Sequence, residues 1–282
     1  MPSEATTIGP YRLLRLLGQG SQAQVHLAEH SHSAQIVALK LVPLTAATDV
    51  QRQAYAQEVL TMRSLVHPDI VATLDAGVEG ELGWLAMEFV AGTSLDRHTL
   101  PSALLPQLEV IRLTRRLAVA LAHAHRLGIV HRDIKPANVL FDRPSHTLKL
   151  ADFGLARAAN SVHTATGMML GSPAYMAPEQ LAGEAPSAQS DLYALGVTMF
   201  ELLTGRRPHE GRSMGELLRQ VANATAPSLL SLRPASPPAV SALLARLLSR
   251  AALARPPGAQ ELAAELQLLE DELASDSDAV SH

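Results

Sequence analysis

The sequence predicts an α+β fold with two lobes: a small antiparallel β-sheet lobe with one main helix, and a larger, mostly helical lobe. Three observations support this prediction. The first ninety or so residues alternate apolar and polar side chains with period two, as strands do. After Gly92, apolar residues recur at spacings of three and four, as in amphipathic helices. The short segment Glu88–Gly92 joins the two patterns and is the expected hinge.

Strands account for most of the small lobe, which we expect at residues 11–90 after an N-terminal extension, residues 1–10. The first strand, Tyr11–Leu17, is followed by a glycine-rich turn, and Ile36–Val42 forms a later strand with clear period-two alternation. A polar helix is expected over about residues 50–65. Two more strands complete the lobe.

Helices are expected through the large lobe, residues 91–273. An apolar stripe predicts a helix that begins near Pro106 and ends at Gly128. The sequence predicts a further helix at residues 191–204, closed by Gly205 and Pro208, and two more at residues 239–248 and 259–273. The acidic tail, residues 274–282, is expected to be disordered.

Composition limits the classes of function. The chain has 282 residues, no cysteine and a formal net charge of −4. It therefore forms no disulfide and has no thiolate zinc site or cysteine nucleophile, and without a basic stripe we expect no nucleic-acid binding. We find no secretory leader and no apolar run of about 18 residues, so we expect a cytoplasmic protein without a membrane segment. A longer, membrane-anchored parent is an alternative that the sequence leaves open.

The stretch HRDIKPANVL, residues 131–140, holds three polar residues suited to phosphoryl transfer. Asp133 can orient a hydroxyl group or accept its proton, Lys135 supplies a compact ammonium for phosphate oxygens, and Asn138 offers a hard oxygen ligand for a small cation. A short loop with solvated charges is the alternative interpretation of this triplet.

Three further segments carry residue types that bind phosphate or a cation. Gly18 and Gly20 in LGQGSQAQV permit a tight loop whose backbone N–H groups can approach phosphates. Lys40 projects from a strand on the same face as the small Ala38, and Asp152 follows a short apolar strand in LADFGLA. Taken singly, each has an ordinary structural explanation: a hairpin turn, an edge-strand charge and a turn residue.

The order of these segments removes the ordinary explanations. A glycine-rich hairpin, a strand lysine, a helix glutamate, HRD, DFG and then APE (residues 177–179) follow one another at compatible spacings. The chain therefore resembles the catalytic domain of the eukaryotic-like (Hanks-type) bacterial serine/threonine protein kinases, over about residues 11–273. The resemblance implies the two-lobed protein kinase fold. It also implies transfer of the γ-phosphoryl group of Mg-ATP to Ser or Thr hydroxyls of proteins, with Mn²⁺ as an alternative metal.

The resemblance implies a nucleotide site formed largely by the small lobe. Lys40, held by Glu58, pairs with the α and β phosphates of ATP, and the loop Gly18–Val25, beginning with Gly18, Gln19 and Gly20, covers the phosphates. The residues implied around adenine are Leu17, Val25, Ala38 and Leu140 as an apolar sandwich, Met87 as gatekeeper, and Glu88 and Val90 for their hinge backbone groups.

In the large lobe, the resemblance implies that Asp133 orients the substrate hydroxyl or accepts its proton and that Lys135 neutralises charge on the γ-phosphate. Asn138 and Asp152 hold magnesium. The residues with implied structural roles are Glu179, which pairs with Arg255, Asp191, which ties down the catalytic loop, and His131, which packs beside Phe153 and Met62. From the residues themselves, we assign the helical His123 and His125 to packing or to the surface, with zinc binding by the pair as the alternative.

Regulation is expected in the segment between DFG and APE. Arg132 is expected to receive a phosphorylated residue there, and the candidates are Ser161, Thr164 and Thr166. We expect autophosphorylation of Thr164 or Thr166 to raise activity. One local departure from the family pattern is RAALAR, which ends at Arg255 and replaces the usual acidic-Pro sequence.

Two other functions were weighed. A pseudokinase would keep the fold as a binding or scaffolding module, but every residue that the chemistry requires is present. A small-molecule kinase is opposed by the APE segment with its peptide-positioning loop. The sequence names no protein substrate, and a homodimer formed back-to-back through the small lobe is an alternative that no residue decides.

Overall fold

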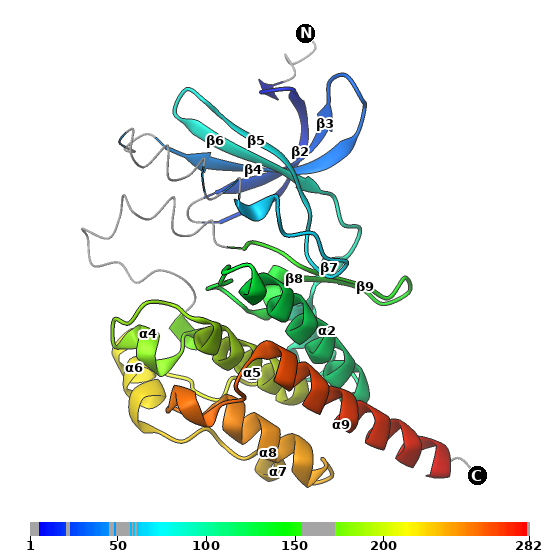
Figure 1. The fold of residues 1–282 in the computed structure, drawn as a ribbon, viewed down its shortest axis with the longest axis vertical. Helices are drawn as coiled ribbons and strands as arrows, with labels where there is room; N and C mark the ends of the chain where they lie inside the picture. Colours follow the sequence, from blue (N-terminus) through cyan, green and yellow to red (C-terminus); the bar gives the residue numbers. More distant parts are fainter. Residues whose placement is uncertain are drawn as a thin grey trace. The chain divides into compact units, whose positions relative to one another are not determined.

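The computed structural model describes residues 6–20, 23–44, 48, 57, 59, 61–153 and 173–280. These residues divide into two compact units, the first formed by residues 6–91 and the second by residues 92–153 and 173–280. The first is built on an antiparallel sheet and the second is mostly helical (Figure 1).

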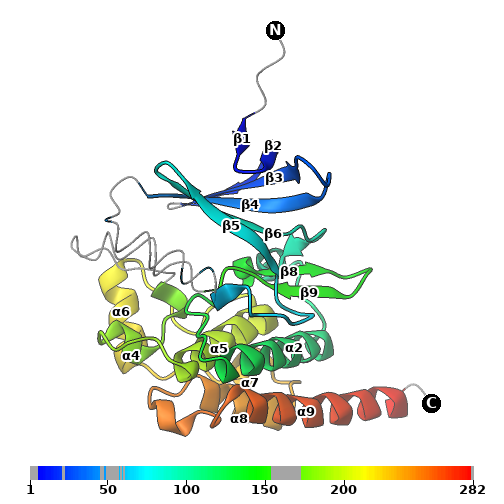
Figure 2. The ribbon, with the colours of Figure 1, turned by 45° about the horizontal axis from the view of Figure 1, so that its top comes forward.

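A six-stranded antiparallel sheet with the order β1-β2-β3-β4-β6-β5 forms the first unit. The strands are β1 Thr7–Ile8, β2 Tyr11–Gln19, β3 Gln24–His30, β4 Ile36–Pro43, β5 Thr73–Glu79 and β6 Leu82–Glu88. Strand β1 lies in the predicted N-terminal extension and pairs with β2, so this part of the extension belongs to the sheet (Figure 2). Strand β2 also runs through Gly18, which pairs with Val25, instead of ending at Leu17.

The period-two pattern of β4 is confirmed by burial. Val37, Leu39 and Leu41 are buried on one face, where they form a core cluster with Tyr11 and Trp84, among others. The Trp84 ring lies against Gly77, where an added Cβ would sit 2.5 Å from the ring. Only glycine fits at this position.

The opposite face of the sheet carries a second core cluster. It contains Val42 and Leu85 from the strands together with Val59 and Met62. Residues 57, 59, 61 and 62 are helical, within the range where the sequence predicts a helix. These apolar helix residues therefore cover the face of β4 that holds Ala38 and Lys40.

The second unit contains most of the helices. They are α2 Gln107–Arg126, α4 Pro178–Leu181, α5 Ala188–Thr204, α6 Met214–Asn223, α7 Leu229–Leu232, α8 Pro238–Leu247 and α9 Ala259–Val280. A three-stranded sheet is formed by β7 Thr93–Ser94, β8 Val139–Asp142 and β9 Thr147–Leu150. Helix α5 is almost entirely buried and contacts α2, α7 and α8, while α9 packs along α2 (Figures 1 and 2).

Glycines end the two central helices as the sequence predicts. Gly128 follows α2 with φ +73°, and Gly205 follows α5 with φ +70°, a left-handed conformation that glycine adopts without steric cost. Helix α5 begins three residues earlier than predicted because Ser187 caps it and accepts a hydrogen bond from Ser190 N.

One expectation about helices was wrong: helix α9 continues to Val280, so residues 274–280 extend a helix instead of forming a disordered tail. Helix α6 was missed, although Met214, Leu217, Leu218 and Val221 recur at the helical spacings of three and four and Ser213 caps the helix. No helix in the described part of the chain has both the length and the apolarity to cross a bilayer.

Candidate active site

The loop between α2 and β8 is fixed by one buried carboxylate from α5. Asp191, only 1% exposed, accepts hydrogen bonds from the backbone N–H of His131 at 2.8 Å and of Arg132 at 2.9 Å. His125 Nε2, from α2, lies 2.8 Å from the same carboxylate. Asp191 therefore ties α2, α5 and the loop together.

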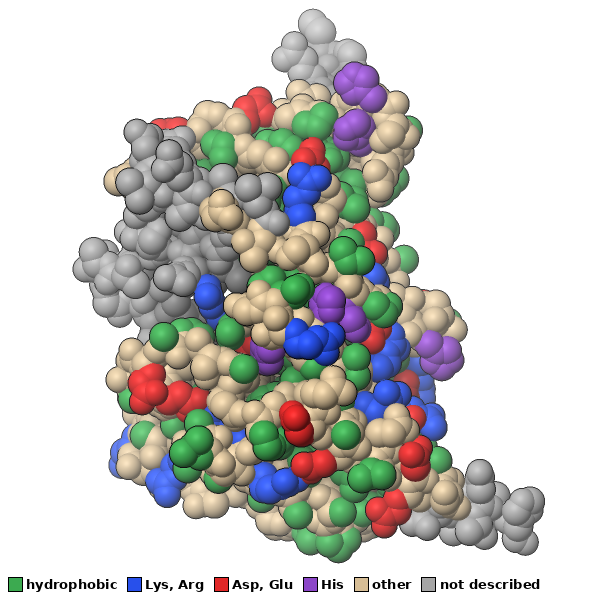
Figure 3. Space-filling model, in the orientation of Figure 1, with side chains coloured by type: hydrophobic (Ala, Val, Ile, Leu, Met, Phe, Trp, Pro, Cys, Tyr) green, Lys and Arg blue, Asp and Glu red, His purple; other side chains and the backbone are tan. Residues whose placement is uncertain are grey.

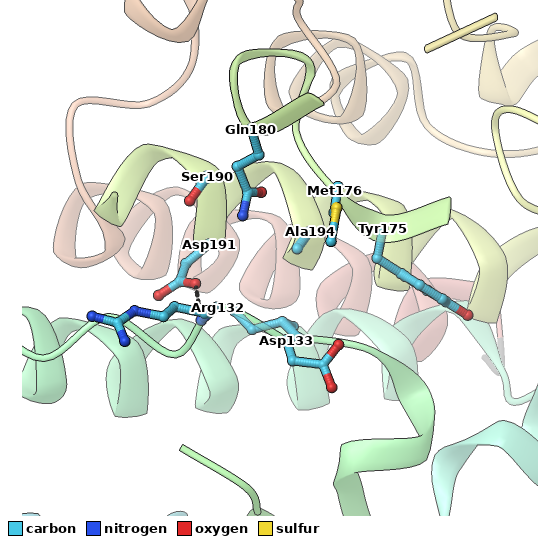
Figure 4. A pocket seen from close by; sticks show the side chains of 9 residues that line it. Arg132, Asp133, Tyr175, Met176, Gln180, Ser190, Asp191 and Ala194 are labelled. Atoms are coloured by element: carbon cyan, nitrogen blue, oxygen red, sulfur yellow. Dashed lines mark hydrogen bonds between the residues drawn. The ribbon is translucent and has the colours of Figure 1, made fainter. Parts of the chain in front are cut away.

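Arg132 adopts an unusual backbone conformation at this point. Its φ is +74°, in the left-handed region that costs a non-glycine residue about 1–3 kcal/mol. The hydrogen bond to Asp191 holds the Arg132 amide in this geometry. As a result, the side chains of Arg132 and Asp133 point in opposite directions along the loop (Figure 4).

His131 is a buried, neutral support for the loop. Burial lowers the pKa of its imidazole, and the side chain lies against the Phe153 ring with the centroids 4.4 Å apart. Its Nε2 lies 2.9 Å from Ala151 O, and its Nδ1 accepts a hydrogen bond from Asp133 N at 3.2 Å. A neutral ring protonated on Nε2 satisfies both contacts.

Asp133, Lys135 and Asn138 meet at one carboxylate oxygen. Lys135 Nζ lies 2.6 Å from Asp133 Oδ2, and Asn138 Nδ2 donates to the same oxygen at 2.9 Å. Within the described residues, neither contact uses Asp133 Oδ1. About a quarter of the Asp133 side chain is exposed.

Asn138 and Asp152 are brought together by the β8–β9 hairpin. Asn138 directly precedes β8, Asp152 follows β9, and Ala151 N donates to Asn138 O at 2.8 Å. The Asn138 side chain uses Nδ2 for Asp133, which leaves its amide oxygen as the end suited to a cation. Asp152 has φ +65°, so its carboxylate leaves the strand direction at this point. One amide oxygen and one carboxylate are a hard donor set that suits Mg²⁺.

A cavity of only about 10 Å³ separates the loop from the segment around Tyr175, Met176 and Gln180 (Figure 4). Tyr175 Oη donates to Glu201 Oε2 at 2.5 Å. Burial, together with this hydrogen bond, raises the pKa of Tyr175, and burial also raises the pKa of Glu201. Because the cavity is so small, the segment before α4, with Tyr175 and Met176, packs closely against the part of the loop that carries Asp133.

Glu179 and Arg255 form the ion pair that the sequence predicted. Arg255, 4% exposed, reaches the two carboxylate oxygens of Glu179 at 2.6 and 2.8 Å, and its guanidinium lies 5.0 Å from the Tyr193 ring centroid. Burial alone would raise the pKa of Glu179, but hydrogen bonds from Arg255 and the backbone outweigh it, so this pKa is lowered. The pair joins α4 to the segment after α8.

In the first unit, several residues predicted to contact the nucleotide share one sheet face. Lys40 pairs with Val25 on β3 and with Leu85 on β6, and Ala38 pairs with Met87. Paired residues in antiparallel strands project to the same side, so Val25, Ala38, Lys40 and Met87 form one surface. Gly18 and Gln19 end β2, and Gly20 N donates to Ala23 O at 2.9 Å.

The remaining predicted residues are less constrained by the structure. Glu88 N donates to Ala72 O at 3.0 Å, so a hinge contact from Glu88 would have to use its carbonyl group. Leu17 lies on β2 and Val90 follows β6, while Leu140 belongs to β8 of the second unit. The predicted residues that lie outside the described part of the chain are Glu58, Ser161, Thr164 and Thr166.

Two contacts around the loop were not predicted. The sequence assigned His125 to packing or to the surface, and it carried no signal for the Tyr175–Glu201 hydrogen bond between residues 26 positions apart. The position of His125 six residues before HRD, on the last turn of α2, was the one available clue.

Comparison with known proteins places this geometry in a family. The model of the protein kinase domain matches residues 11–265. The chain is 35% identical over 261 residues to the serine/threonine-protein kinase PrkC of Bacillus subtilis, a match that covers 92% of this chain and 40% of PrkC. The crystal structure of the Mycobacterium tuberculosis PknI kinase domain is 30% identical, with a TM-score of 0.74, and the match covers 95% of this chain and 98% of that domain.

A more distant structure shares the fold. Rad53 residues 1–466, crystallised with AMP-PNP, gives a TM-score of 0.76 at 24% identity, with 90% of this chain and 64% of that chain covered. The chain spans about 40% or less of the length of PrkC and of two further curated bacterial kinases that it matches. The domain match and the PknI likeness extend over nearly all of this chain. The chain therefore belongs to the protein kinase domain family.

Proposed function

We propose that this chain is a serine/threonine protein kinase that transfers the γ-phosphoryl group of ATP to protein hydroxyls. The observation that carries the proposal is the arrangement of Asp133, Lys135 and Asn138 in a loop held by Asp191. Asp133 Oδ1 accepts the hydrogen bond of the attacking hydroxyl and orients its oxygen. Lys135 Nζ, within reach of the same site, stabilises negative charge on the transferred group.

Asn138 and Asp152 hold magnesium in this proposal. When bound, the ion neutralises charge on the ATP phosphates. Lys40 takes the α and β phosphates, with Glu58 as its partner, and the Gly18–Val25 loop covers them. The apolar residues proposed for adenine are Leu17, Val25, Ala38 and Leu140. Manganese fits the same oxygen donors.

The partners in this proposal are proteins with exposed Ser or Thr residues. On the face drawn in Figure 3, acidic and basic side chains are interspersed, and this mixture supports protein acceptors better than nucleic acid. The proposal places the domain in the cytoplasm, where ATP is available. It includes activation by phosphorylation of Thr164 or Thr166, with Arg132 as receiver, and leaves back-to-back pairing through the first unit as a separate question.

The acceptor class is tested with [γ-³²P]ATP and magnesium. The chain is incubated with casein, with histone and with an aminoglycoside, and labelled protein is hydrolysed to identify the phosphoamino acid. We expect phosphoserine and phosphothreonine without phosphotyrosine. Label on the aminoglycoside alone would overturn the proposal in favour of a small-molecule kinase. Nucleotide binding without any transfer, including from a phosphorylated preparation, would favour a binding module.

A further inference from the structure

The second unit has a large groove that shares no lining residue with the catalytic loop. The groove has a volume of about 810 Å³ and lies between the end of α6, the segment before α7, and α8 with the residues that follow it (Figure 1 shows these helices in yellow and orange). Its floor is formed by the buried side chains of Leu229, Leu244 and Leu248. Small residues, including Ala245 and Ala251, form its walls. We call it the α6–α8 groove.

The stretch of chain that forms the groove contains no acidic residue. Between Glu216 and Glu261 the sequence has five arginines and neither Asp nor Glu, although the whole chain has a net charge of −4. Arg246 and Arg255 pair with carboxylates from outside this stretch. Arg250 lines the groove, and within the described residues its hydrogen bonds go only to two backbone carbonyl groups at the end of α6, from Nη1 at 3.3 Å each. Arg250 is therefore a positive charge without a carboxylate, so the groove suits an acidic ligand.

The segment before α7 offers backbone groups to a ligand. Residues 224–228 lie outside helix and strand, and the backbone is extended at both ends, with φ −89° and ψ 147° at Ala224 and φ −63° and ψ 136° at Ser228. In the described part of the chain, neither the N–H nor the C=O group of Thr225 or Ala226 makes a backbone hydrogen bond. Such groups on an extended segment can pair with a second extended chain, as at the edge of a sheet. The small side chains along the groove let that chain approach closely.

We propose that the α6–α8 groove binds an extended, acidic peptide segment of a partner protein. An Asp or Glu of the segment accepts hydrogen bonds from the guanidinium of Arg250, and the backbone of the segment pairs with Thr225 and Ala226. The hydroxyl groups of Ser228 and Ser241, which lie 3.3 Å apart in the lining, can donate to or accept from further backbone groups. The positive charge selects an acidic ligand, and the unpaired extended backbone selects a ligand with backbone groups of its own.

Fluorescence anisotropy of the 282-residue chain with pools of labelled hexapeptides tests this binding without nucleotide and independently of the kinase activity proposed above. Each pool carries mixed Ala, Leu, Ser and Val, with Asp, Asn or Lys fixed at the third position. We expect the Asp pool to bind with a dissociation constant on the order of 100 μM, and at least about tenfold more tightly than the Lys pool. N-methylation of the peptide bonds that flank Asp should weaken binding, because it removes backbone donors.

Charge reversal in the protein sharpens the test. Arg250→Glu should weaken binding of the Asp pool at least about tenfold and turn the preference towards the Lys pool, a change that loss of folding cannot produce. Arg219→Glu is the matched control, because Arg219 is an exposed residue of α6 that does not line the groove. On α8, Ala245→Phe fills the groove and should weaken binding of the Asp pool. Ala242→Phe, at an exposed position of the same helix that does not line the groove, should not.

Several results would overturn the proposal. One is the absence of binding of every pool with the chain at up to about 500 μM, and another is equal binding of the Asp, Asn and Lys pools. Equal weakening by Arg250→Glu and Arg219→Glu would show a non-specific attraction to positive charge. Full displacement of the Asp pool by octanoate, together with insensitivity to N-methylation, would assign the groove to a small aliphatic carboxylate instead of a peptide.

Discussion

Two carboxylates organise two regions of the second unit in different ways. Asp191 accepts hydrogen bonds from two backbone N–H groups and so fixes the path of the catalytic loop, including the left-handed Arg132. Glu179 pairs with the guanidinium of Arg255 and so joins α4 to the segment after α8. The first carboxylate sets the geometry of the loop that carries Asp133, whereas the second compensates a buried charge. Loss of the first should therefore act mainly on catalysis, and loss of the second mainly on stability.

The largest expected effect on activity comes from Asp191→Asn. An amide oxygen can accept from one backbone N–H, but the amide nitrogen then faces the other, so the loop shifts. A shift of about 1 Å costs about 100-fold in kcat. Steady-state kinetics with saturating ATP measure this loss. The exposed Asp271→Asn should leave kcat unchanged. An equal loss of kcat in both variants would contradict the claim that Asp191 sets the geometry of the catalytic loop.

Glu179→Ala should act on stability instead. It leaves the guanidinium of Arg255 buried without its carboxylate, which lowers the free energy of unfolding by about 3 kcal/mol. Urea denaturation measures this difference. The matched control is Glu265→Ala, which removes the largely exposed partner of Arg246 and should cost less than about 1 kcal/mol. Similar losses in the two variants would contradict the role given to Glu179.

A smaller effect is expected from Lys135→Arg. The arginine keeps the charge, but its planar guanidinium cannot replace a compact ammonium 2.6 Å from Asp133 Oδ2, so kcat should fall roughly tenfold. Lys149→Arg, the same change on β9, is the control and should stay within about twofold of the wild type. An unchanged kcat in Lys135→Arg would remove Lys135 from the chemistry.

The smallest effects should appear in the pH dependence of stability. Burial lowers the pKa of His131 and of His209 below 6.5, so the unfolded chain binds protons that the folded chain does not. Stability is therefore complete above pH 6.5 and is lost as the pH falls below it, by up to about 1.4 kcal/mol per pH unit for each group. The pKa of Glu179 is lowered from 4.5, so its contribution is lost only at pH values below that.

Urea denaturation at pH 7.5, 6.5 and 5.5 measures this dependence. His209→Phe should flatten the loss between pH 6.5 and 5.5, with the exposed His32→Phe as control. Burial raises the pKa of Glu201, which acts in the opposite sense, so the variant decides: a His209→Phe protein that loses as much stability as the wild type between pH 6.5 and 5.5 would contradict the assignment of a neutral, buried His209. As the pH falls, we expect the loss of stability that depends on the histidines to come first and the loss of stability that depends on Glu179 to come second.

Much of the fold follows from patterns that are local in sequence. The alternation of side chains with period two predicted β4, and glycines predicted the ends of α2 and α5. Both signals arise within a single element, so they can be recognised in the sequence. Helix α6 was missed although its apolar residues recur at helical spacings, and the extension of α9 to Val280 contradicted an inference drawn from acidic composition alone. An acidic composition does not exclude a helix at residues 274–280, because the preceding turns of α9 are already helical and the chain can continue them.

In the candidate site, too, some residues follow from a local motif, whereas other contacts could be found only in the folded structure. Asp133, Lys135 and Asn138 lie within six residues of one another, so a local motif was enough to find them. The contact between His125 and Asp191 joins residues 66 positions apart, and neither residue alone indicates it. The family resemblance placed Asp191 near the loop, but which backbone groups it binds, and in what geometry, required the folded structure.

The most direct test of the central claim compares the wild type with Asp133→Asn. Each protein is incubated with ATP and magnesium, phosphate is mapped by mass spectrometry, and ATP affinity is measured separately by titration calorimetry. We predict phosphate on Thr164, Thr166 or Ser161 in the wild type only, with ATP binding retained in the variant, because asparagine cannot accept the hydroxyl proton. Equal phosphorylation in both proteins would contradict the claim that Asp133 directs phosphoryl transfer.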